Sequence, residues 1–140
     1  MSNGWERIRL RVETKESLKS GNMADINETR TISCHILDTS LGKAAHGVHI
    51  TLYRQLADDQ WQELNKAITN EDGRVNQLLS FADFQTSVYK LKFDILPYFE
   101  EKKTPSFYPF IEVVVKCERG QHYHIPLLLS PFGYTTYRGS

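Results

Sequence analysis

The sequence contains little cysteine, no excess of either charge and no long apolar run. Only two cysteines, Cys34 and Cys117, occur in 140 residues, far fewer than in small secreted domains that depend on disulfides, so we expect free thiols in a reducing compartment. No stretch approaches the roughly 20 apolar residues of a membrane helix, and the first residues lack the apolar segment of a signal peptide. These absences predict an intracellular protein that spans no membrane.

The charges balance, with 17 Lys plus Arg residues against 17 Asp plus Glu residues. A chain without net charge has no field that draws it to nucleic acid or to an anionic membrane, so a small molecule or another protein is the expected partner. The length of 140 residues and the 40% share of hydrophobic residues suffice for one buried core and not for two. We therefore expect a single folded domain.

The first part of the chain differs from the rest. Residues 1–28 are rich in charged side chains and poor in large apolar ones, so they offer little with which to build a core. We interpret them as a polar N-terminal extension whose composition is compatible with disorder. Residues 29–140 form the expected domain.

Short runs rich in β-branched and aromatic residues, separated by turn residues, fill the chain from Thr31 onward, a pattern typical of all-β domains. One segment breaks the pattern, because Pro97 precedes a run that ends in cations at Lys103, which predicts a short helix. The expected architecture is a sandwich of two packed antiparallel sheets with this helix at one edge. The expected strands are Thr31 to Leu37, Val48 to Leu56, Trp61 to Thr69, Val88 to Ile95, Phe107 to Cys117 and Gln121 to Leu129.

Three histidines lie on strand faces that the core does not use. In the last expected strand, alternation places Tyr123 and its apolar partners on one face and both His122 and His124 on the other. His35 likewise shares a polar face with Ser33, opposite the apolar residues of its strand. An imidazole can act as a base near neutral pH, although each histidine taken alone is also compatible with an ordinary surface position.

An arginine and the C-terminal segment add further candidates. Arg74 directly follows the turn from Asn70 to Gly73, and its guanidinium suits planar anionic oxygens, while a solvated turn arginine is the simpler interpretation. The last residues keep aromatic, cationic and hydroxyl groups where most termini are plainly polar. They are suited to binding a planar heterocycle, and the alternative is an edge strand without a further role.

Taken together, these pieces resemble the transthyretin-like family and, within it, the enzymatic branch of 5-hydroxyisourate hydrolases. The resemblance runs in order from about Thr31 to Ser140. Two positions depart from the usual pattern, Cys34 in place of Thr and Ala44 in place of Pro, and neither removes a catalytic side chain. The motifs that carry the resemblance are Ser33-Cys34-His35-Ile36-Leu37-Asp38-Thr39, Thr69-Asn70-Glu71-Asp72-Gly73-Arg74, Phe107-Tyr108-Pro109, His122-Tyr123-His124-Ile125-Pro126-Leu127-Leu128-Leu129-Ser130-Pro131 and Tyr137-Arg138-Gly139-Ser140.

The resemblance implies an enzyme that hydrolyses 5-hydroxyisourate to 2-oxo-4-hydroxy-4-carboxy-5-ureidoimidazoline in urate degradation, with neither a cofactor nor a metal. It implies that His35 and His124 orient and deprotonate water, and that Arg74 stabilises charge on the substrate oxygens. It also implies a homotetramer that is a dimer of dimers. The residues that it implies in substrate binding are Tyr137, Arg138, Gly139 and Ser140.

Several alternatives stay open. A transthyretin-type carrier of a small aromatic ligand would share the fold without needing the histidines. His122, His124 and His35 would also suit a three-histidine zinc centre with an open position, which chelation would reveal. Either His35 or His124 can be the general base. The expected compartment is the cytoplasm, with the peroxisome as the alternative, since the sequence ends in Arg-Gly-Ser and not in a signal of the Ser-Lys-Leu type.

Overall fold

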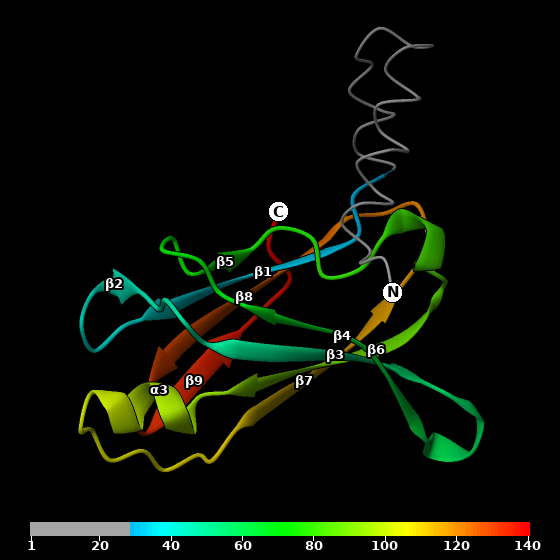
Figure 1. Cartoon of the computed structure of the whole chain (residues 1–140). Helices are drawn as coiled ribbons and strands as arrows, with labels where there is room; N and C mark the ends of the chain where they lie inside the picture. The colour runs from blue at the N-terminus through cyan, green and yellow to red at the C-terminus, as the bar shows by residue number, and fades with distance from the viewer. Residues whose placement is uncertain (1–28) are drawn as a thin grey trace, which may run out of the picture.

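The computed structural model describes residues 29–140, so the interpretation of residues 1–28 as a polar extension lies outside the described residues. The described chain forms two sheets that pack face to face around one core (Figure 1). The elements are β1 (Ile32–Asp38), β2 (Lys43–Ala44), β3 (His49–Gln55), η1 (Ala57–Asp59), β4 (Trp61–Ile68), β5 (Arg74–Val75), η2 (Phe81–Asp83), β6 (Ser87–Asp94), α3 (Leu96–Glu101), β7 (Ile111–Cys117), β8 (Tyr123–Ser130) and β9 (Gly133–Thr136).

One sheet has the strand order β2-β1-β8-β9, with β5 also paired to β1, and the other has the order β4-β3-β6-β7. Within the described residues, the predicted all-β sandwich of two sheets with one short α-helix, α3, is confirmed. One pair differs from the prediction of wholly antiparallel sheets, because β1 and β8 run parallel. The chain between them crosses to the other sheet, and such a long connection can return a strand in the same direction, whereas a tight hairpin cannot.

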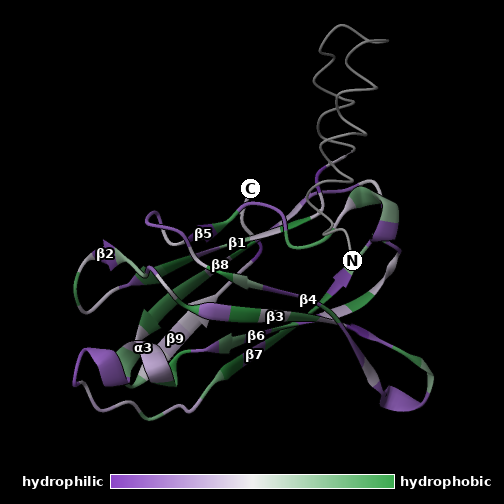
Figure 2. Cartoon of the chain, viewed as in Figure 1, coloured by the Kyte–Doolittle hydropathy of each residue, from purple (hydrophilic) through white to green (hydrophobic). Residues whose placement is uncertain are grey.

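The core follows the two-residue alternation of the strands. In β1 the side chains of Ile32, Cys34 and Ile36 are fully buried between the sheets, and β8 contributes Ile125 and Leu127 from the same side of the sheet. Figure 2 shows the hydrophobic residues along β8 and β7 and the hydrophilic ones at the turn between β3 and β4. The residues that point the other way on β1 and β8 are thereby free for chemistry.

Most predicted strands overlap the observed ones to within two residues at each end, with one larger difference. The strand expected from Phe107 begins at Ile111. Phe107 instead donates its backbone N–H to the carbonyl of Pro131, and Pro109 has no N–H to give to a ladder. The strands β2 and β5 have two residues each and were not predicted, because such short elements leave no periodicity to detect.

Helix α3 is tied to the end of β1 by one buried hydrogen bond. Pro97 stands at its first turn, as predicted, and Tyr98 and Phe99 face the core. The Tyr98 hydroxyl donates to the Asp38 carboxylate at 2.7 Å. Burial, followed by this hydrogen bond and the charge of Asp38, raises the pKa of Tyr98. The bond therefore holds a buried carboxylate at the end of the strand that carries His35.

Within residues 29–140, no helix has the length and the apolar character needed to cross a membrane.

Candidate active site

The parallel register of β1 and β8 sets the first part of the site. Ser33 lies opposite His124, and His35 lies opposite Pro126. Because residues that are paired in register point to the same side of a sheet, Ser33 and His124 emerge together on the face turned away from the core. Strand β5 adds a third segment. It pairs with the edge of β1 opposite β8, and there Arg74 is the register partner of His35. The structure thus brings His35, His124 and Arg74 together on neighbouring strands.

The Ser33 side chain joins two of the histidines. Its Oγ lies 2.8 Å from Nδ1 of His124 and 2.9 Å from Nε2 of His122. Ser33 is only 4% exposed, so this contact is sheltered from water. The hydroxyl fixes the orientation of both rings relative to β1.

His35 and His124 face each other across a short gap. Their ring centroids are 6.4 Å apart, and the rings are tilted by 36°. The pKa of each is lowered, first by burial and second by the positive charge of Arg74. A hydrogen bond with the backbone of Asp72 holds the His35 ring and raises its pKa against these effects. Both imidazoles are therefore favoured in the neutral form that can accept a proton.

His122 lies on the other side of His124, with 6.4 Å between their ring centroids. Burial lowers its pKa to about 4, and the charges of Arg30, His124 and Arg138 act in the same direction. A histidine with such a pKa is neutral at physiological pH and serves as a hydrogen-bonding group there.

The turn before β5 places Arg74. Asn70 Oδ1 accepts hydrogen bonds from the backbone N–H groups of Asp72 at 2.9 Å and of Arg74 at 3.0 Å. Gly73 has a φ of +72°, and a Cβ there would collide with the carbonyl oxygen of Ile36, so only glycine fits. Within residues 29–140 the guanidinium of Arg74 has no carboxylate within ion-pair distance. Its charge therefore acts on the two histidines and on whatever occupies the gap.

The C-terminal segment approaches the site through its backbone. Gly139 donates its N–H to the carbonyl of His124 at 2.8 Å and forms an isolated antiparallel bridge with it. A Cβ at Gly139 would lie 2.7 Å from Cδ2 of His124. The segment therefore passes against the His124 ring so closely that a side chain at this position would displace one of the two.

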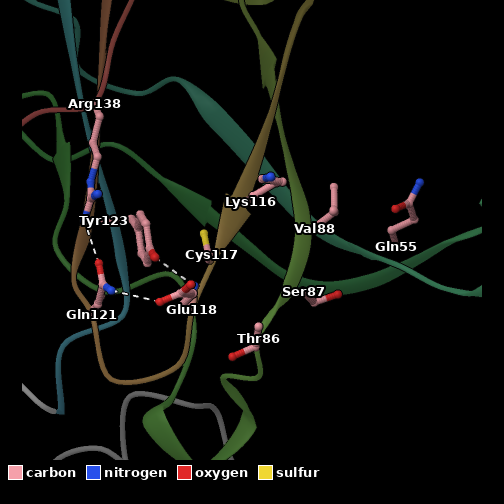
Figure 3. Close-up of a pocket in the computed structure, with 10 residues that line it drawn as sticks. All are labelled: Gln55, Thr86, Ser87, Val88, Lys116, Cys117, Glu118, Gln121, Tyr123 and Arg138. Atoms are coloured by element: carbon pink, nitrogen blue, oxygen red, sulfur yellow. Dashed lines mark hydrogen bonds between the residues drawn. The ribbon is translucent and has the colours of Figure 1, made fainter.

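The Arg138 side chain lies away from the histidines. Its guanidinium stacks over the ring of Tyr123 at 4.4 Å, and Nη2 donates to Oε1 of Gln121 at 3.2 Å. Figure 3 shows this arrangement in a hollow of about 610 Å³ that is also lined by Cys117 and Glu118. Tyr123 and His124 point to opposite faces of β8, so this hollow and the histidine cluster lie on different sides of the strand.

The remaining candidates from the sequence lie apart. Tyr137 is 56% exposed and lines a separate hollow with residues of β7, and Ser140 is exposed. His46 and His49 are exposed. Among residues 29–140, no group of three or more His, Cys, Asp or Glu side chains is arranged to hold a metal ion.

Both cysteines are free and buried. Burial raises the pKa of Cys34 and of Cys117 to about 12 in each case. A thiol with such a pKa is protonated near neutral pH and is a weak nucleophile. The Cys34 thiol next to His35 in sequence therefore belongs to the core, as its place on the apolar face of β1 predicted.

Sequence reasoning missed two participants. Ser33 was placed on the same face as His35, but its contact with two histidines depends on the register between β1 and β8, which no local pattern reveals. Arg30, whose charge lowers the pKa of His122 and His124, lies just before β1 and carried no motif.

The fold and the cluster together define a class of protein, a transthyretin-like sandwich with the neutral histidines and the arginine of a hydrolytic site. The chain belongs to the HIUase/Transthyretin family, whose model matches residues 32–139. The resemblance drawn from the motifs is thereby confirmed.

Relatives in sequence are enzymes by name. A 5-hydroxyisourate hydrolase of Mus musculus is 44% identical over 115 residues, which cover 81% of this chain and 98% of the relative. A 5-hydroxyisourate hydrolase of Salmonella typhimurium is 43% identical over 110 residues, which cover 78% of this chain and 80% of the relative. The region that the family model matches includes the strands that carry the histidine cluster and the turn before Arg74.

Relatives in structure are of two kinds. Sea bream transthyretin in complex with thyroxine has a TM-score of 0.74 and 30% identity, with 77% of this chain and 93% of that chain covered. The 5-hydroxyisourate hydrolase of Klebsiella pneumoniae has a TM-score of 0.69 and 33% identity, with 79% of this chain and 99% of that chain covered. The fold is therefore shared by a carrier and an enzyme, and the side chains of the site must distinguish them.

Proposed function

We propose that this chain hydrolyses 5-hydroxyisourate to 2-oxo-4-hydroxy-4-carboxy-5-ureidoimidazoline, a step of urate degradation. The observation that carries the proposal is the pair of neutral imidazoles, His35 and His124, that face each other beside the guanidinium of Arg74. The names of the relatives in mouse and Salmonella support the substrate. A carrier would gain nothing from histidines that are kept unprotonated.

The reaction needs a base for water. We place the reacting water between His35 and His124, whose ring centroids are 6.4 Å apart. One imidazole takes a proton from this water, and the resulting hydroxide bonds to the carbonyl carbon of a ring amide. The carbon–nitrogen bond then breaks, and the leaving nitrogen receives the proton back from the same imidazole. The atoms balance without a cofactor.

Arg74 supplies the positive charge that stabilises the oxyanion of the reaction. As the tetrahedral oxyanion forms, a guanidinium with two parallel N–H groups stabilises it and orients the planar ring. The same cation keeps both histidines ready to accept a proton, since it lowers the pKa of each. Arg74 therefore supports the base before the reaction and the oxyanion during it.

We assign Tyr137, Arg138, Gly139 and Ser140 to substrate binding. The support for Gly139 is its contact with His124. In the single chain the side chains of Tyr137 and Arg138 lie along the other side of β8. Loss of residues 137–140 is expected to lower turnover by orders of magnitude and to leave the fold intact.

We also propose a homotetramer built as a dimer of dimers. The support is that β7 and β9 are the edge strands of their sheets and carry exposed apolar side chains, among them Val114 and Tyr134. Unpaired strands of this kind favour pairing with another copy. For the compartment we propose the cytoplasm, with the peroxisome as the alternative, and the two free buried thiols are compatible with either.

The decisive assay generates 5-hydroxyisourate in situ from urate with a urate oxidase and follows its ultraviolet decay. Wild-type protein should accelerate the decay, His124→Ala should not, and the exposed His49→Ala should match the wild type. Circular dichroism first establishes that all three share one fold. No acceleration by folded wild-type protein would favour the carrier. Loss of activity on exhaustive chelation would favour the zinc alternative.

A further inference from the structure

The hydroxyl of Ser33 lies between two ring nitrogens and has only one hydrogen to donate. Nδ1 of His124 is 2.8 Å away and Nε2 of His122 is 2.9 Å away. Both distances are those of good hydrogen bonds. If both rings are neutral, Ser33 must donate to one and accept from the other. The three groups therefore form a chain of hydrogen bonds, which can run in either of two directions, or senses.

The sense of the chain decides what His124 can do. In one sense His124 donates its Nδ1–H to Ser33, which donates to His122, and Nε2 of His124 keeps a lone pair. In the other sense His122 donates to Ser33, which donates to Nδ1 of His124, and Nε2 of His124 carries the hydrogen. Only the first sense leaves His124 able to take a proton from water on the side of its ring opposite Ser33.

The proposed reaction requires the first sense, because only there does His124 keep a free lone pair for the water. Arg74 lies close enough to His35 and His124 to lower the pKa of both. His122 is suited to be the final acceptor, because its pKa of about 4 keeps it neutral.

We propose that Ser33 is a positioning residue for the hydrolysis, which accepts the Nδ1–H of His124, donates to Nε2 of His122 and so leaves Nε2 of His124 as the general base. This inference rests on the proposed function and deepens it. It assigns the base to His124, and it gives His122 the part of fixing the sense of the chain. His35, held by the backbone of Asp72, then orients the water from the other side.

The burial of Ser33 keeps water from replacing its hydroxyl between the two histidines. Ser33 is 4% exposed and is the register partner of His124, so water does not replace its hydroxyl without movement of β1 or β8. When His124 becomes protonated, both of its nitrogens carry hydrogen, and the bond from Nδ1 to Ser33 is retained and strengthened by the charge. The chain thus supports the base before and after proton transfer.

The test combines tautomer measurement with kinetics. Nitrogen-15 spectra are recorded near pH 8 on protein with labelled histidines, and the signals are assigned with variants that each lack one histidine. They should show the hydrogen of His124 on Nδ1. In Ser33→Ala this preference should be lost, kcat should fall about 10- to 100-fold and KM should stay within about threefold, because the base and not the binding site is altered. Ser33→Thr keeps the hydroxyl and should restore both the spectrum and most of kcat.

A second variant checks the role of His122. In His122→Ala the Ser33 hydroxyl loses its acceptor and turns to Nδ1 of His124, so the hydrogen should move to Nε2 and kcat should fall. Ser87→Ala, at a half-buried serine of the other sheet, should leave spectrum and kcat unchanged. A wild-type spectrum with the hydrogen on Nε2, or a Ser33→Ala protein with wild-type kcat, would overturn the inference. A wild-type protein without hydrolase activity would overturn the proposed function as well, and the assay separates the two cases.

Discussion

The cations on the outward faces of the two sheets differ in their partners. On the four-stranded sheet, the Lys90 ammonium lies 3.2 Å from the Glu112 carboxylate and over the rings of Tyr53 and Trp61, at 4.8 and 4.5 Å from their centroids. On the other sheet, the Arg74 guanidinium has no carboxylate partner within residues 29–140, and its charge falls on neutral histidines. We call the outward face of the four-stranded sheet, where Lys90 has partners, the satisfied face. The outward face of the other sheet, where Arg74 has no carboxylate partner among residues 29–140, is the incomplete face.

The difference teaches where function lies. A cation that is paired and stacked contributes a little stability and has nothing further to bind. A cation such as Arg74, which is exposed and has neutral bases beside it, is available to stabilise a ligand or a developing charge. Four changes test whether this contrast is real.

The largest effect is expected from removal of the unpaired cation. Arg74→Gln should lower kcat/KM about 100- to 1,000-fold, because it removes the group that stabilises the oxyanion. Arg74→Lys should recover only part of this, since an ammonium lacks the two parallel N–H groups. Steady-state kinetics with 5-hydroxyisourate measures both.

The matched control is Arg54→Gln, because Arg54 on β3 donates to the carbonyl of Asp83 and lies on the satisfied sheet. It should keep kcat/KM within about twofold of wild type and lower only stability. Equal losses of activity in Arg54→Gln and Arg74→Gln would contradict a special role for Arg74.

The next effect comes from the contact between the C-terminal segment and His124. Gly139→Ala places a methyl group 2.7 Å from Cδ2 of His124 and should lower kcat about 10-fold or more as the ring or the segment moves. Gly133→Ala, where the nearest atom is Ser130 Oγ at 3.7 Å, should behave as wild type. The same assay compares them, and similar activities would argue against a role for Gly139.

The pH dependence of stability should reflect the incomplete face. The pKa of His122 falls to about 4 in the folded protein, and the pKa values of His35 and His124 are lowered too. Unfolded histidines bind protons below about pH 6.5, so the folded state should lose stability as the pH falls from about 6.5 toward 4. His122→Gln should remove on the order of 1 kcal/mol of this loss, measured by urea unfolding at pH 7 and pH 5. If the unfolding free energy changed between pH 7 and pH 5 by the same amount in His122→Gln as in wild type, His122 would not be a source of the loss.

The smallest effect belongs to the satisfied face. Lys90→Met keeps the aliphatic packing but removes the ion pair and the cation–π contacts, so it should cost about 1 kcal/mol of unfolding free energy. Its kcat/KM should be unchanged. A loss of activity as large as that of Arg74→Lys would show that the outer face of the four-stranded sheet takes part in the reaction.

Local pattern predicted the fold better than it predicted the connections within the site. The alternation in β1 and β8 identified which residues face the core, and therefore which histidines do not. The parallel pairing of β1 and β8 could not be predicted in this way, because it joins residues about ninety positions apart, and the Ser33 contacts depend on it. Arg74 could be located after its turn, but its place beside His35 required the pairing of β5, a strand of two residues.

The parallel pairing of β1 with β8 also has a consequence for synthesis of the protein. Ser33 and His124 are 91 positions apart, and the Gly139 bridge forms only after β8 is in place. Pairings of such long range close large loops and are slow to form, so the edge of β1 that pairs with β8 stays unpaired until β8 has been made. If Gly139 positions the C-terminal segment beside His124, as we propose, a chain that is released early or trimmed before residue 139 should fold without a working site.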